Sequence, residues 1–147
     1  MLNAATTAFG RLTIRELRVR TVRVPMQIPH STASGVITES PLVLTDVITD
    51  EGVVGHSIVF TYTAAALEPT ASLIRNFAPL LNGEPLAPRE IEHKLARRLR
   101  LLGTQGLVGM ALAAIDMALW DSLPRHVVDT TARRCREAAA SVWSRRV

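Results

Sequence analysis

The side chains in this sequence that could carry acid–base or metal chemistry are few and widely spaced. Its histidines are His30, His56, His93 and His126. None of them forms the i,i+4 pair that binds a metal from one face of a helix, and neither a glycine-rich phosphate loop nor a cysteine pair occurs. General acid–base catalysis needs histidines, carboxylates or lysines positioned in a shared pocket. The sequence therefore predicts no catalytic residue and no metal ligand.

Several titratable residues stand in contexts that favour structural roles. Asp116 is flanked by apolar residues, and we favour a buried hydrogen-bond acceptor over a functional acid because no second titratable group lies at helical spacing to tune its pKa. Asp121 either caps the next segment or pairs with an arginine. His56 follows Gly55 in an expected strand, where burial is favoured over metal ligation. His93 is expected to be solvated on the polar side of a helix.

Residues 26–40 are the stretch whose composition most suggests binding. They place several polar side chains beside Gly35, namely His30, Ser31, Thr32, Ser34 and Thr38. No hydrophobic period runs through them, so we expect a long irregular loop, and loops of this length in a compact domain are usually functional or mobile. Two interpretations stay open: a solvated loop, or a binding lid with Gly35 as the hinge and the hydroxyls facing a ligand.

Three strands are expected around this loop. Residues 12–24 alternate apolar and polar side chains and are rich in β-branched residues. The alternation slips twice, which predicts a bulge or a strong twist, and Pro25 and Pro29 are expected to end the strand. Residues 41–49 and 53–60 form the other two strands, joined by a tight turn in which Gly52 supplies a positive φ. This order predicts an antiparallel meander with one face covered by helices.

Three helices are expected after the strands. The first begins after Thr63 as N-cap, and Pro69 breaks its first turn or restarts it. The second begins at Pro88, a favourable first helical position, and its apolar stripe is Ile91, Leu95, Leu99 and Leu102. The third runs from about residue 105 to 123 and is apolar on most faces, so it is buried or needs a partner. The predicted fold class is α+β.

Composition and charge describe a globular chain with an unusual C-terminal segment. Of the 147 residues, 48% are hydrophobic and 20% are charged, proportions typical of a folded domain. The net charge of +4 comes from residues 124–147, which hold six arginines against two acidic residues, while the rest of the chain is neutral. A nucleic-acid-binding domain would carry a basic stripe on its folded body, so this class of protein is disfavoured.

The location of the protein is predicted from equally simple features. The single cysteine, Cys135, has arginine neighbours that could lower its pKa, but it cannot form an internal disulfide. Residues 1–10 have neither the basic leader nor the continuous apolar core of a secretory signal. The apolar run 107–120 is too short to span a bilayer and contains Asp116. We expect a soluble, cytoplasmic protein without a membrane partner.

Several short motifs together resemble one known family. They are PLVLTD at 41–46, GVVGHS at 52–57, the pair Tyr62 and Thr63, EPLAP at 84–88, and ALAAIDMALWD at 111–121. Their order and spacing make residues 11–123 similar to the N-terminal capping domain of the enolase superfamily, in its mandelate racemase/muconate lactonizing enzyme branch. The resemblance implies a three-stranded sheet with helices that caps a modified (β/α) barrel. It also implies abstraction of a proton α to a carboxylate, giving an enediolate held by Mg²⁺.

In that family the cap contributes two loops that close over the substrate and set specificity. The resemblance places His30, Thr32 and Ile37 on the first lid loop and Tyr62 on the second. His30 stands where the mandelate racemase pattern has a small apolar residue. Acid sugars and other hydroxy acids are therefore expected as substrates as readily as mandelate. The family's lysine bases, its His–Asp dyad and its acidic Mg²⁺ ligands belong to the barrel. No cofactor is therefore expected for this chain itself.

The barrel has no counterpart in this sequence. A barrel takes about 200 residues, whereas residues 124–147 are all that follow the junction, and Lys94 as the single lysine excludes the family's paired-lysine motif. Ser122 and Pro124 stand where the family prefers small aliphatic residues and Gly or Ala. We expect residues 1–10 to be disordered and 11–123 to form the cap. Residues 124–147 are expected to be a non-homologous arginine-rich tail, produced by a frameshift in GC-rich DNA or, alternatively, forming a genuine amphipathic helix over residues 130–143.

Three functions are compatible with these observations, in descending order of preference. The first is the lid-domain fragment of a Mg²⁺-dependent racemase or dehydratase of 2-hydroxy acids or acid sugars, inactive alone and able to self-associate through exposed apolar surface. The second is a stand-alone binding or regulatory module that pairs with intact homologues. The third is a basic nucleic-acid-associated protein, which predicts salt-dependent DNA binding that is lost when residues 124–147 are deleted.

Overall fold

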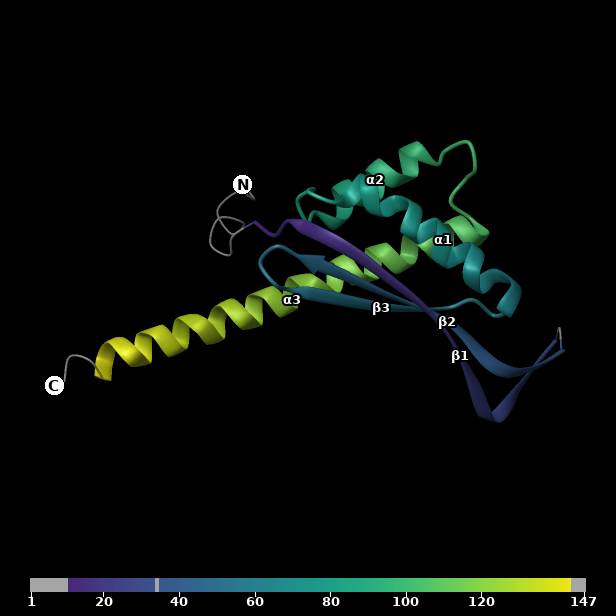
Figure 1. Cartoon of the computed structure of the whole chain (residues 1–147), viewed down its shortest axis with the longest axis horizontal. Helices are drawn as coiled ribbons and strands as arrows, with labels where there is room; N and C mark the ends of the chain where they lie inside the picture. Colours follow the sequence, from purple (N-terminus) through teal and green to yellow (C-terminus); the bar gives the residue numbers. More distant parts are fainter. Residues whose placement is uncertain (1–10, 34, 144–147) are drawn as a thin grey trace.

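The computed structural model describes residues 11–33 and 35–143 and has the predicted α+β architecture. A three-stranded antiparallel sheet in the order β1–β2–β3 is followed by three helices, and this part of the chain contains no barrel (Figure 1). The elements are β1 (Ile14–Thr32), β2 (Gly35–Thr49), β3 (Val54–Phe60), α1 (Ala64–Leu81), α2 (Pro88–Arg98) and α3 (Gly106–Trp143). The N-terminal segment 1–10, predicted to be disordered, and Ser34 of the predicted lid lie outside the described residues.

The short hairpin between β2 and β3 forms as predicted. Gly52 adopts a φ of 83°, and its N–H donates to the Thr49 carbonyl oxygen at 3.1 Å. The Thr49 hydroxyl accepts a further hydrogen bond from the Val53 N–H at 3.1 Å. The turn fixes a register in which Ile48 faces Val54 and Asp46 faces His56. It therefore decides which side chains of β2 and β3 share a face of the sheet.

The prediction of a long irregular loop at residues 26–40 is wrong, because these residues continue β1 and begin β2. The ladder runs from Glu16–Ile48 to Pro25–Glu39 and resumes at His30–Ile37. Between these two pairings, four residues of β1 (26–29) face one residue of β2, Thr38. Pro29 lies in this bulge, where no ladder hydrogen bond needs its missing N–H, and β1 is an edge strand, where proline is tolerated. The result is a long two-stranded hairpin.

Of the two slips in the apolar pattern of β1, one is a bulge and the other is a change of face. The register shifts between Ile14 and Glu16, which confirms the first slip as an irregularity of the ladder. No shift occurs between Val19 and Val22, so the second slip moves the apolar residues to the other face of the sheet. Val22 is half-buried there and Val24 is exposed. Strand β1 therefore presents apolar side chains to both faces.

The predicted helix starts are confirmed, and three details of the helices differ. The predicted end of the third helix at about residue 123 is wrong, because α3 runs on to Trp143. The Thr63 hydroxyl accepts from the Ala65 N–H at 3.4 Å at the start of α1, and α2 begins at Pro88. Helix α1 continues through Pro69, which was expected to interrupt it, because the apolar side chains of its inner face hold it against the core. Leu102, predicted as the last member of the α2 stripe, is 73% exposed. Helix α2 ends at Arg98, and the chain turns away through Gly103 with a φ of 78°.

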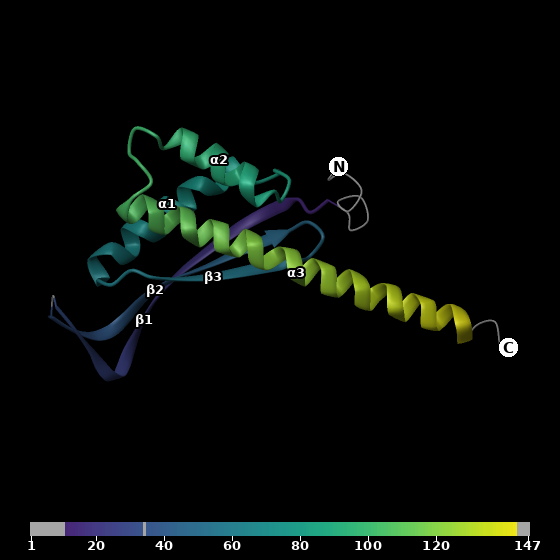
Figure 2. The same cartoon turned by 180° about the vertical axis from the view of Figure 1, so that it is seen from behind.

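The core lies between one face of the sheet and the helices. Fully buried side chains from every layer meet there, among them Ile14, Val43 and Val47 from the strands, Ile74 and Leu81 from α1, Leu95 from α2, and Ile115 and Leu119 from α3. Helix α1 packs beside β1 and α3 beside β3, while α2 packs against α3 from outside (Figures 1 and 2). Among the residues that the structure describes, no helix packs on the opposite face of the sheet.

Helix α3 combines a core segment with a projecting segment. It crosses the sheet next to β3 and continues beyond the body of the molecule, past Pro124 to Trp143 (Figure 2). The apolar run at 107–120 was expected to be too short to span a bilayer, but the helix that contains it is long and apolar enough over residues 106–129, with a mean hydropathy of 1.4. Their inner face is packed into the core through Ala111, Ala114 and Ala118, and a core helix passes the same test of length and composition. This part of α3 therefore belongs to the domain core.

Candidate functional site

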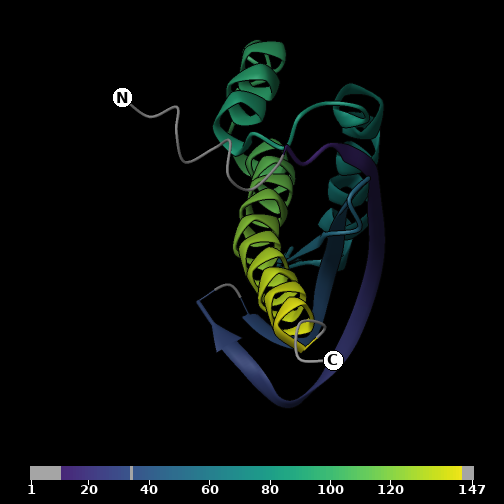
Figure 3. The same ribbon diagram turned by 90° about the vertical axis from the view of Figure 1, so that its left-hand side faces the viewer.

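The four residues proposed for the lid lie at one end of the sheet, on two segments. His30 and Ile37 face each other as a cross-strand pair near the tip of the β1–β2 hairpin, and Thr32 faces Gly35 at the turn. Tyr62 lies between β3 and α1. Figure 3 shows β1 curving strongly, so that the hairpin turns out of the plane of the three-stranded part of the sheet. The structure thus brings three of these residues together on the hairpin and places Tyr62 near the point where the hairpin leaves the sheet.

The hairpin tip presents both polar and apolar side chains to solvent. Ile28 is 84% exposed and Val36 is 64% exposed, while Ile37 is half-buried and His30 is exposed. The Thr32 hydroxyl donates to the Gly35 carbonyl oxygen at 2.8 Å, so it closes the turn. Exposed apolar side chains on a projecting hairpin are suited to covering a ligand and excluding water from it. Among the described residues of the hairpin tip, His30 has the only imidazole that could transfer a proton.

Tyr62 marks the base of the hairpin and has an unusual backbone. Its φ of 61° lies in the left-handed region that non-glycine residues seldom adopt. Its ring is 64% exposed and lies 4.8 Å from the Phe60 ring, tilted by 55°. The preceding residue, Thr61, donates its N–H to the Pro41 carbonyl oxygen at 3.0 Å, which ties this corner to the start of the hairpin. Such backbone strain is typical of residues that a binding site holds in place.

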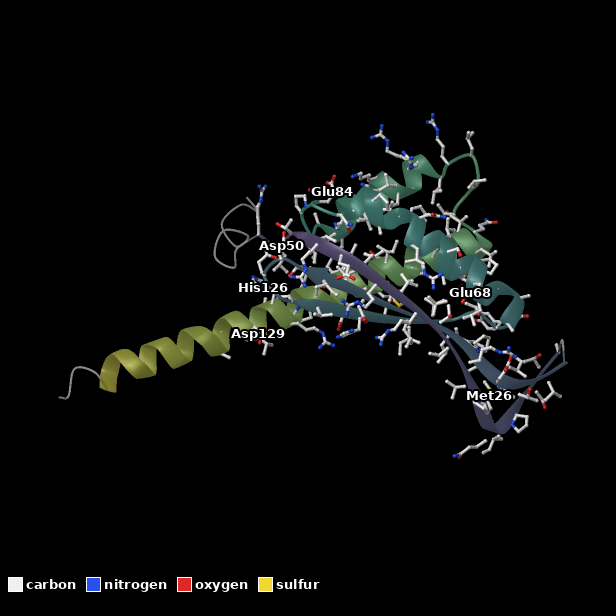
Figure 4. The ribbon with its side chains drawn as sticks, viewed as in Figure 1. Met26, Asp50, Glu68, Glu84, His126 and Asp129 are labelled. Atoms are coloured by element: carbon white, nitrogen blue, oxygen red, sulfur yellow. The ribbon has the colours of Figure 1, made fainter. Side chains whose placement is uncertain are left out.

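Helix α1 fixes this end of the sheet from the other side. The Thr21 hydroxyl on β1 donates to the Glu68 carboxylate at 2.7 Å, and Arg75 lies 3.3 Å from the same carboxylate. These two contacts lower the pKa of Glu68, with the Thr21 hydrogen bond the larger cause. Figure 4 shows Glu68 on α1 at the same end of the molecule as Met26 on the hairpin. The base of the hairpin is therefore anchored, while its tip projects free of the helices.

At the other end of the sheet, polar side chains lock α3 to the edge of β3. The Asp121 carboxylate accepts the His56 backbone N–H at 2.8 Å and the Arg125 guanidinium at 2.7 Å. The Arg125 contact and then the His56 N–H hold the pKa of Asp121 below its usual value. Asp121 therefore has the structural role predicted for it and pairs with an arginine as one of the two expectations stated. Because an unpaired strand edge invites association, this carboxylate also protects β3.

His56 is half-exposed, so its predicted burial is wrong. Asp46 faces it across the β2–β3 ladder, and the His56 Nδ1 lies 2.8 Å from Asp46 Oδ1. Arg20 of β1 donates to the other oxygen of Asp46 at 3.1 Å. The side chains of Arg20 and His56 are exposed to solvent because no described helix covers this face of the sheet. The Asp46 side chain between them is only 12% exposed. Periodicity alone did not reveal the pairing, although the hairpin register contains it.

A groove of about 560 Å³ lies beside this network, between the β2–β3 turn and α3. Its polar lining includes His56, Asp121 and Arg125, and Val128 contributes to its apolar lining. The three polar side chains are already engaged with one another or with Asp46. The groove therefore offers few polar groups free to hold a ligand.

Asp116 has a perturbed carboxyl group that the sequence did not explain. Burial raises its pKa, the nearby Glu92 carboxylate on α2 raises it further, and the Trp120 indole N–H, which hydrogen-bonds to it, lowers it. Glu92 is 24 residues away in the chain and comes near only because α2 packs on α3. The Trp120 contact does lie at helical i,i+4 spacing, and it fits the structural role that we favoured. His93, on the same helix as Glu92, is exposed as predicted.

The described residues do not fit a metal centre or a set of catalytic bases. Over residues 11–33 and 35–129, no group of three or more histidine, cysteine or acidic side chains could hold a metal ion. Lys94 is engaged at 2.7 Å with Glu84 and at 2.9 Å with the Leu80 carbonyl oxygen. Because a magnesium ion needs several oxygen ligands in near-octahedral geometry, this part of the chain supplies no such site. What the arrangement can do is bind and cover.

Residues 1–123 have no net charge, and several arginines of the folded body form ion pairs. Each of five arginines lies within 3.3 Å of a carboxylate: Arg18 with Glu16, Arg20 with Asp46, Arg23 with Glu39, Arg75 with Glu68, and Arg125 with Asp121. Phosphate binding depends on cations that are free to replace counterions. These pairs therefore weaken the case for a nucleic-acid surface on the folded body.

Comparisons with known proteins agree with the architecture and with the motifs. A family model described as "Mandelate racemase / muconate lactonizing enzyme, N-terminal domain" matches residues 14–130, which continues past residue 123, where the cap was expected to end. An enolase from Bradyrhizobium, crystallised with magnesium and mandelic acid, is 44% identical with a TM-score of 0.73 over 79% of this chain and 32% of its own. An enolase from the alphaproteobacterium BAL199 with bound magnesium is 35% identical, with a TM-score of 0.74 and the same coverage of both chains.

A third solved structure supports the fold alone. L-talarate dehydratase from Polaromonas sp. JS666, in complex with magnesium and L-glucarate, is 24% identical with a TM-score of 0.71, over 79% of this chain and 33% of its own. The chain thus spans about a third of the length of these solved structures. On the family match, the identity to the Bradyrhizobium structure and the shared fold, this chain belongs to the mandelate racemase/muconate lactonizing enzyme family of the enolase superfamily, whose N-terminal domain it contains.

Proposed function

We propose that this chain acts as the substrate-capping domain of a magnesium-dependent enolase-superfamily enzyme, a racemase or dehydratase that abstracts a proton α to the carboxylate of a 2-hydroxy acid or an acid sugar. The observation that carries the proposal is the projecting β1–β2 hairpin with Tyr62 at its base, in a chain of this family. A relative 44% identical was crystallised with magnesium and mandelic acid, and a more distant one with magnesium and L-glucarate. These two ligands represent the two substrate classes proposed.

In this proposal the chain covers the substrate and does not carry out the chemistry. The exposed Ile28 and Val36 exclude water from the covered site, and His30 and Tyr62 contact the part of the substrate that points away from the metal. Magnesium, when bound, would stabilise the additional negative charge that develops on the substrate carboxylate as the α-carbon loses its proton. It is held outside the described residues, which offer no ligand set for it. The isolated chain is therefore proposed to be inactive and to bind no magnesium.

Two other functions have weaker support. A stand-alone binding module is favoured by one observation, the apolar side chains that α3 exposes at Met117, Trp120 and Val127. A nucleic-acid-associated protein is disfavoured because residues 1–123 carry no net charge and four of their arginines are paired with carboxylates. The capping role explains both the hairpin and the family match, whereas the other two functions explain neither.

A chimeric enzyme tests the capping role directly. Residues 11–123 of this chain replace the matching segment of the Bradyrhizobium relative, and turnover is measured with mandelate, other 2-hydroxy acids and acid sugars. We expect turnover of at least one of these substrates. His30→Ala and Tyr62→Ala should each change kcat/KM by about tenfold or more, which corresponds to about 1.4 kcal/mol of transition-state binding.

His93→Ala is the matched control for the chimera. His93 is an exposed histidine on α2, away from the hairpin, so its replacement should leave kcat/KM unchanged. A folded, magnesium-binding chimera that turns over none of the acids would contradict the capping role. So would hairpin variants that behave like His93→Ala with every substrate.

A further inference from the structure

Along the helix-facing side of β1, the partners of successive side chains change toward the hairpin tip. Alternate residues of a strand point to the same face of a sheet, and the ladder has no shift between Val19 and Arg23. Val19 packs against the core, and Thr21 donates to Glu68 of α1. Arg23, the next residue on this face, forms an ion pair with Glu39 of β2. The partner thus changes from the helices to the neighbouring strand at the base of the projecting hairpin.

The Arg23–Glu39 ion pair is short and forked. The Arg23 Nε donates to both carboxylate oxygens of Glu39, at 3.0 and 3.1 Å, and the Arg23 Nη2 donates to Oε1 at 2.7 Å. In the ladder Arg23 faces Pro41 and Glu39 faces Pro25, so the two side chains meet along a diagonal that long side chains can span. The hydrogen bond to Glu39 is the main cause that raises the pKa of the Arg23 guanidinium. The pair therefore links β1 and β2 at the last regular pairing before the bulge.

The register of the hairpin tip depends on such a link. Residues 26–29 of β1 face the single residue Thr38, and the ladder resumes at His30 and Ile37. A slip of one residue across this bulge would turn every later side chain to the opposite face of the hairpin. A buried apolar face usually prevents such slips, but none of the described side chains at 26–40 is buried. Side-chain contacts bracket the tip instead, one across the turn and the Arg23–Glu39 pair at the base.

We propose that Arg23 and Glu39 are positioning residues for the lid, and that their ion pair fixes the register in which β2 enters the hairpin tip. The pair holds His30 beside Ile37 and so sets which side chains the tip turns toward a substrate. The effect on a substrate rests on the capping function proposed above, whereas the effect on register concerns the chain alone. Arg23 and Glu39 touch no substrate in this proposal and act only through the residues of the tip.

Amide hydrogen exchange of the full 147-residue chain tests the effect on register. Arg23→Ala and Glu39→Ala should each speed exchange at residues 30–33 and 35–37 by about threefold, the scale expected for a well-formed surface ion pair. The double variant should exchange no faster than either single variant, because both changes remove the same pair. At about 1 M salt the difference from the parent chain should shrink, since exposed charges are screened.

Glu16→Ala is the matched control for exchange. Glu16 forms an exposed ion pair with Arg18 at 3.2 Å, but both residues lie on β1 far along the strand from the hairpin tip. Its replacement should leave exchange at the tip unchanged, and the amides of α1 serve as an internal reference for the folded state. Exchange in Glu39→Ala no faster than in Glu16→Ala, or single effects that add in the double variant, would overturn the proposal.

The chimeric enzyme described above tests the effect on a substrate. Glu39→Ala should raise KM about threefold and leave kcat unchanged, because a tip of loosened register has to be ordered when the substrate binds. A variant that had only lost folded protein would show a lower kcat at the same KM. Faster exchange at the tip with an unchanged KM would overturn the positioning role. A chimera that is inactive with Arg23 and Glu39 both in place counts against the capping function, and exchange in the full chain then decides whether the pair holds the register.

Discussion

Gly55 is the position where a single added carbon should cost this domain most. It lies on β3 where α3 crosses the strand, and a Cβ built there would come within 3.0 Å of three atoms of α3: the Ala118 carbonyl oxygen, the Ser122 hydroxyl and the Ser122 backbone nitrogen. Two of these belong to the helix backbone, which cannot move aside as a flexible side chain does. Gly55→Ala therefore has to displace α3 from the sheet.

The cost follows from what α3 holds in place. Displacing the helix loosens the fully buried Ala118 and the nearly fully buried Leu119, and it strains the Asp121 contact to the His56 N–H. Over-packing usually costs 1–3 kcal/mol, and a clash with backbone lies at the upper end, so we expect Gly55→Ala to lower the free energy of unfolding by about 3 kcal/mol. For a domain of this size that corresponds to a fall of about 10 °C in Tm. Urea and thermal denaturation followed by circular dichroism measure both.

Gly52→Ala provides the matched control. Gly52 has a φ of 83°, and nothing lies within 4 Å of a Cβ placed there, so alanine meets strain but no clash. It should cost about 1 kcal/mol. The double variant Gly55→Ala with Ser122→Ala should recover only part of the loss, because the Ala118 carbonyl oxygen remains. If Gly55→Ala costs no more than Gly52→Ala, the close approach of β3 and α3 is refuted.

Three further substitutions test individual polar groups. Thr45 is fully buried on β2 with its hydroxyl unpaired, so Thr45→Val should raise the free energy of unfolding by about 1 kcal/mol; Thr49→Val, which removes the acceptor of the Val53 N–H, should lower it in the same urea experiment, and equal effects would contradict this reasoning. Because the pKa of Asp116 is raised above 3.8, its carboxyl stabilises the fold fully only below that pH and loses this contribution as pH rises through the folded pKa. Asp116→Asn should therefore raise Tm at pH 7 but not at pH 3; a lower Tm at pH 7 would refute this. The pKa of Asp121 is shifted the opposite way, so its contribution is present above pH 3.8 and disappears as pH falls through the lower folded pKa. Asp121→Asn should flatten the acid end of the Tm profile, and an unchanged profile would count against the contacts to Arg125 and the His56 N–H.

The turn chemistry was the most informative part of the sequence. Gly52, Thr63 and Pro88 each have a local reason for their position, and each fixes the end of an element without help from the rest of the fold. The β2–β3 turn also implies the cross-strand pair Asp46 and His56, since both lie at equal distances from its centre. The hairpin register therefore implies this pair from the sequence alone, whereas burial of His56 does not follow from it, because that face of β3 is open to solvent.

The hairpin could not be predicted in the same way. Its strands lack a regular apolar period at residues 26–40 because no layer packs on either side of them, and burial is what creates such a period. Prolines at 25 and 29 favoured a break, yet an edge strand with a bulge accepts both. Similarly, Asp116 and Glu92 come together only through the packing of α2 on α3, and no local pattern encodes that contact.

The two hairpins of the meander differ in how they are held: the short one is packed against α3, and the long one projects from the sheet. At the short hairpin, Gly55 lets α3 touch the strand and Asp121 binds the His56 N–H, so this end cannot move without breaking the core. At the long hairpin, four residues of β1 face one residue of β2, which bends the ladder and releases the tip from the helices. Helix α3 thus anchors the sheet at one end, while the hairpin at the other end keeps its exposed side chains available. Such an arrangement suits a segment that covers a ligand, because a lid needs a fixed base and a tip that can close.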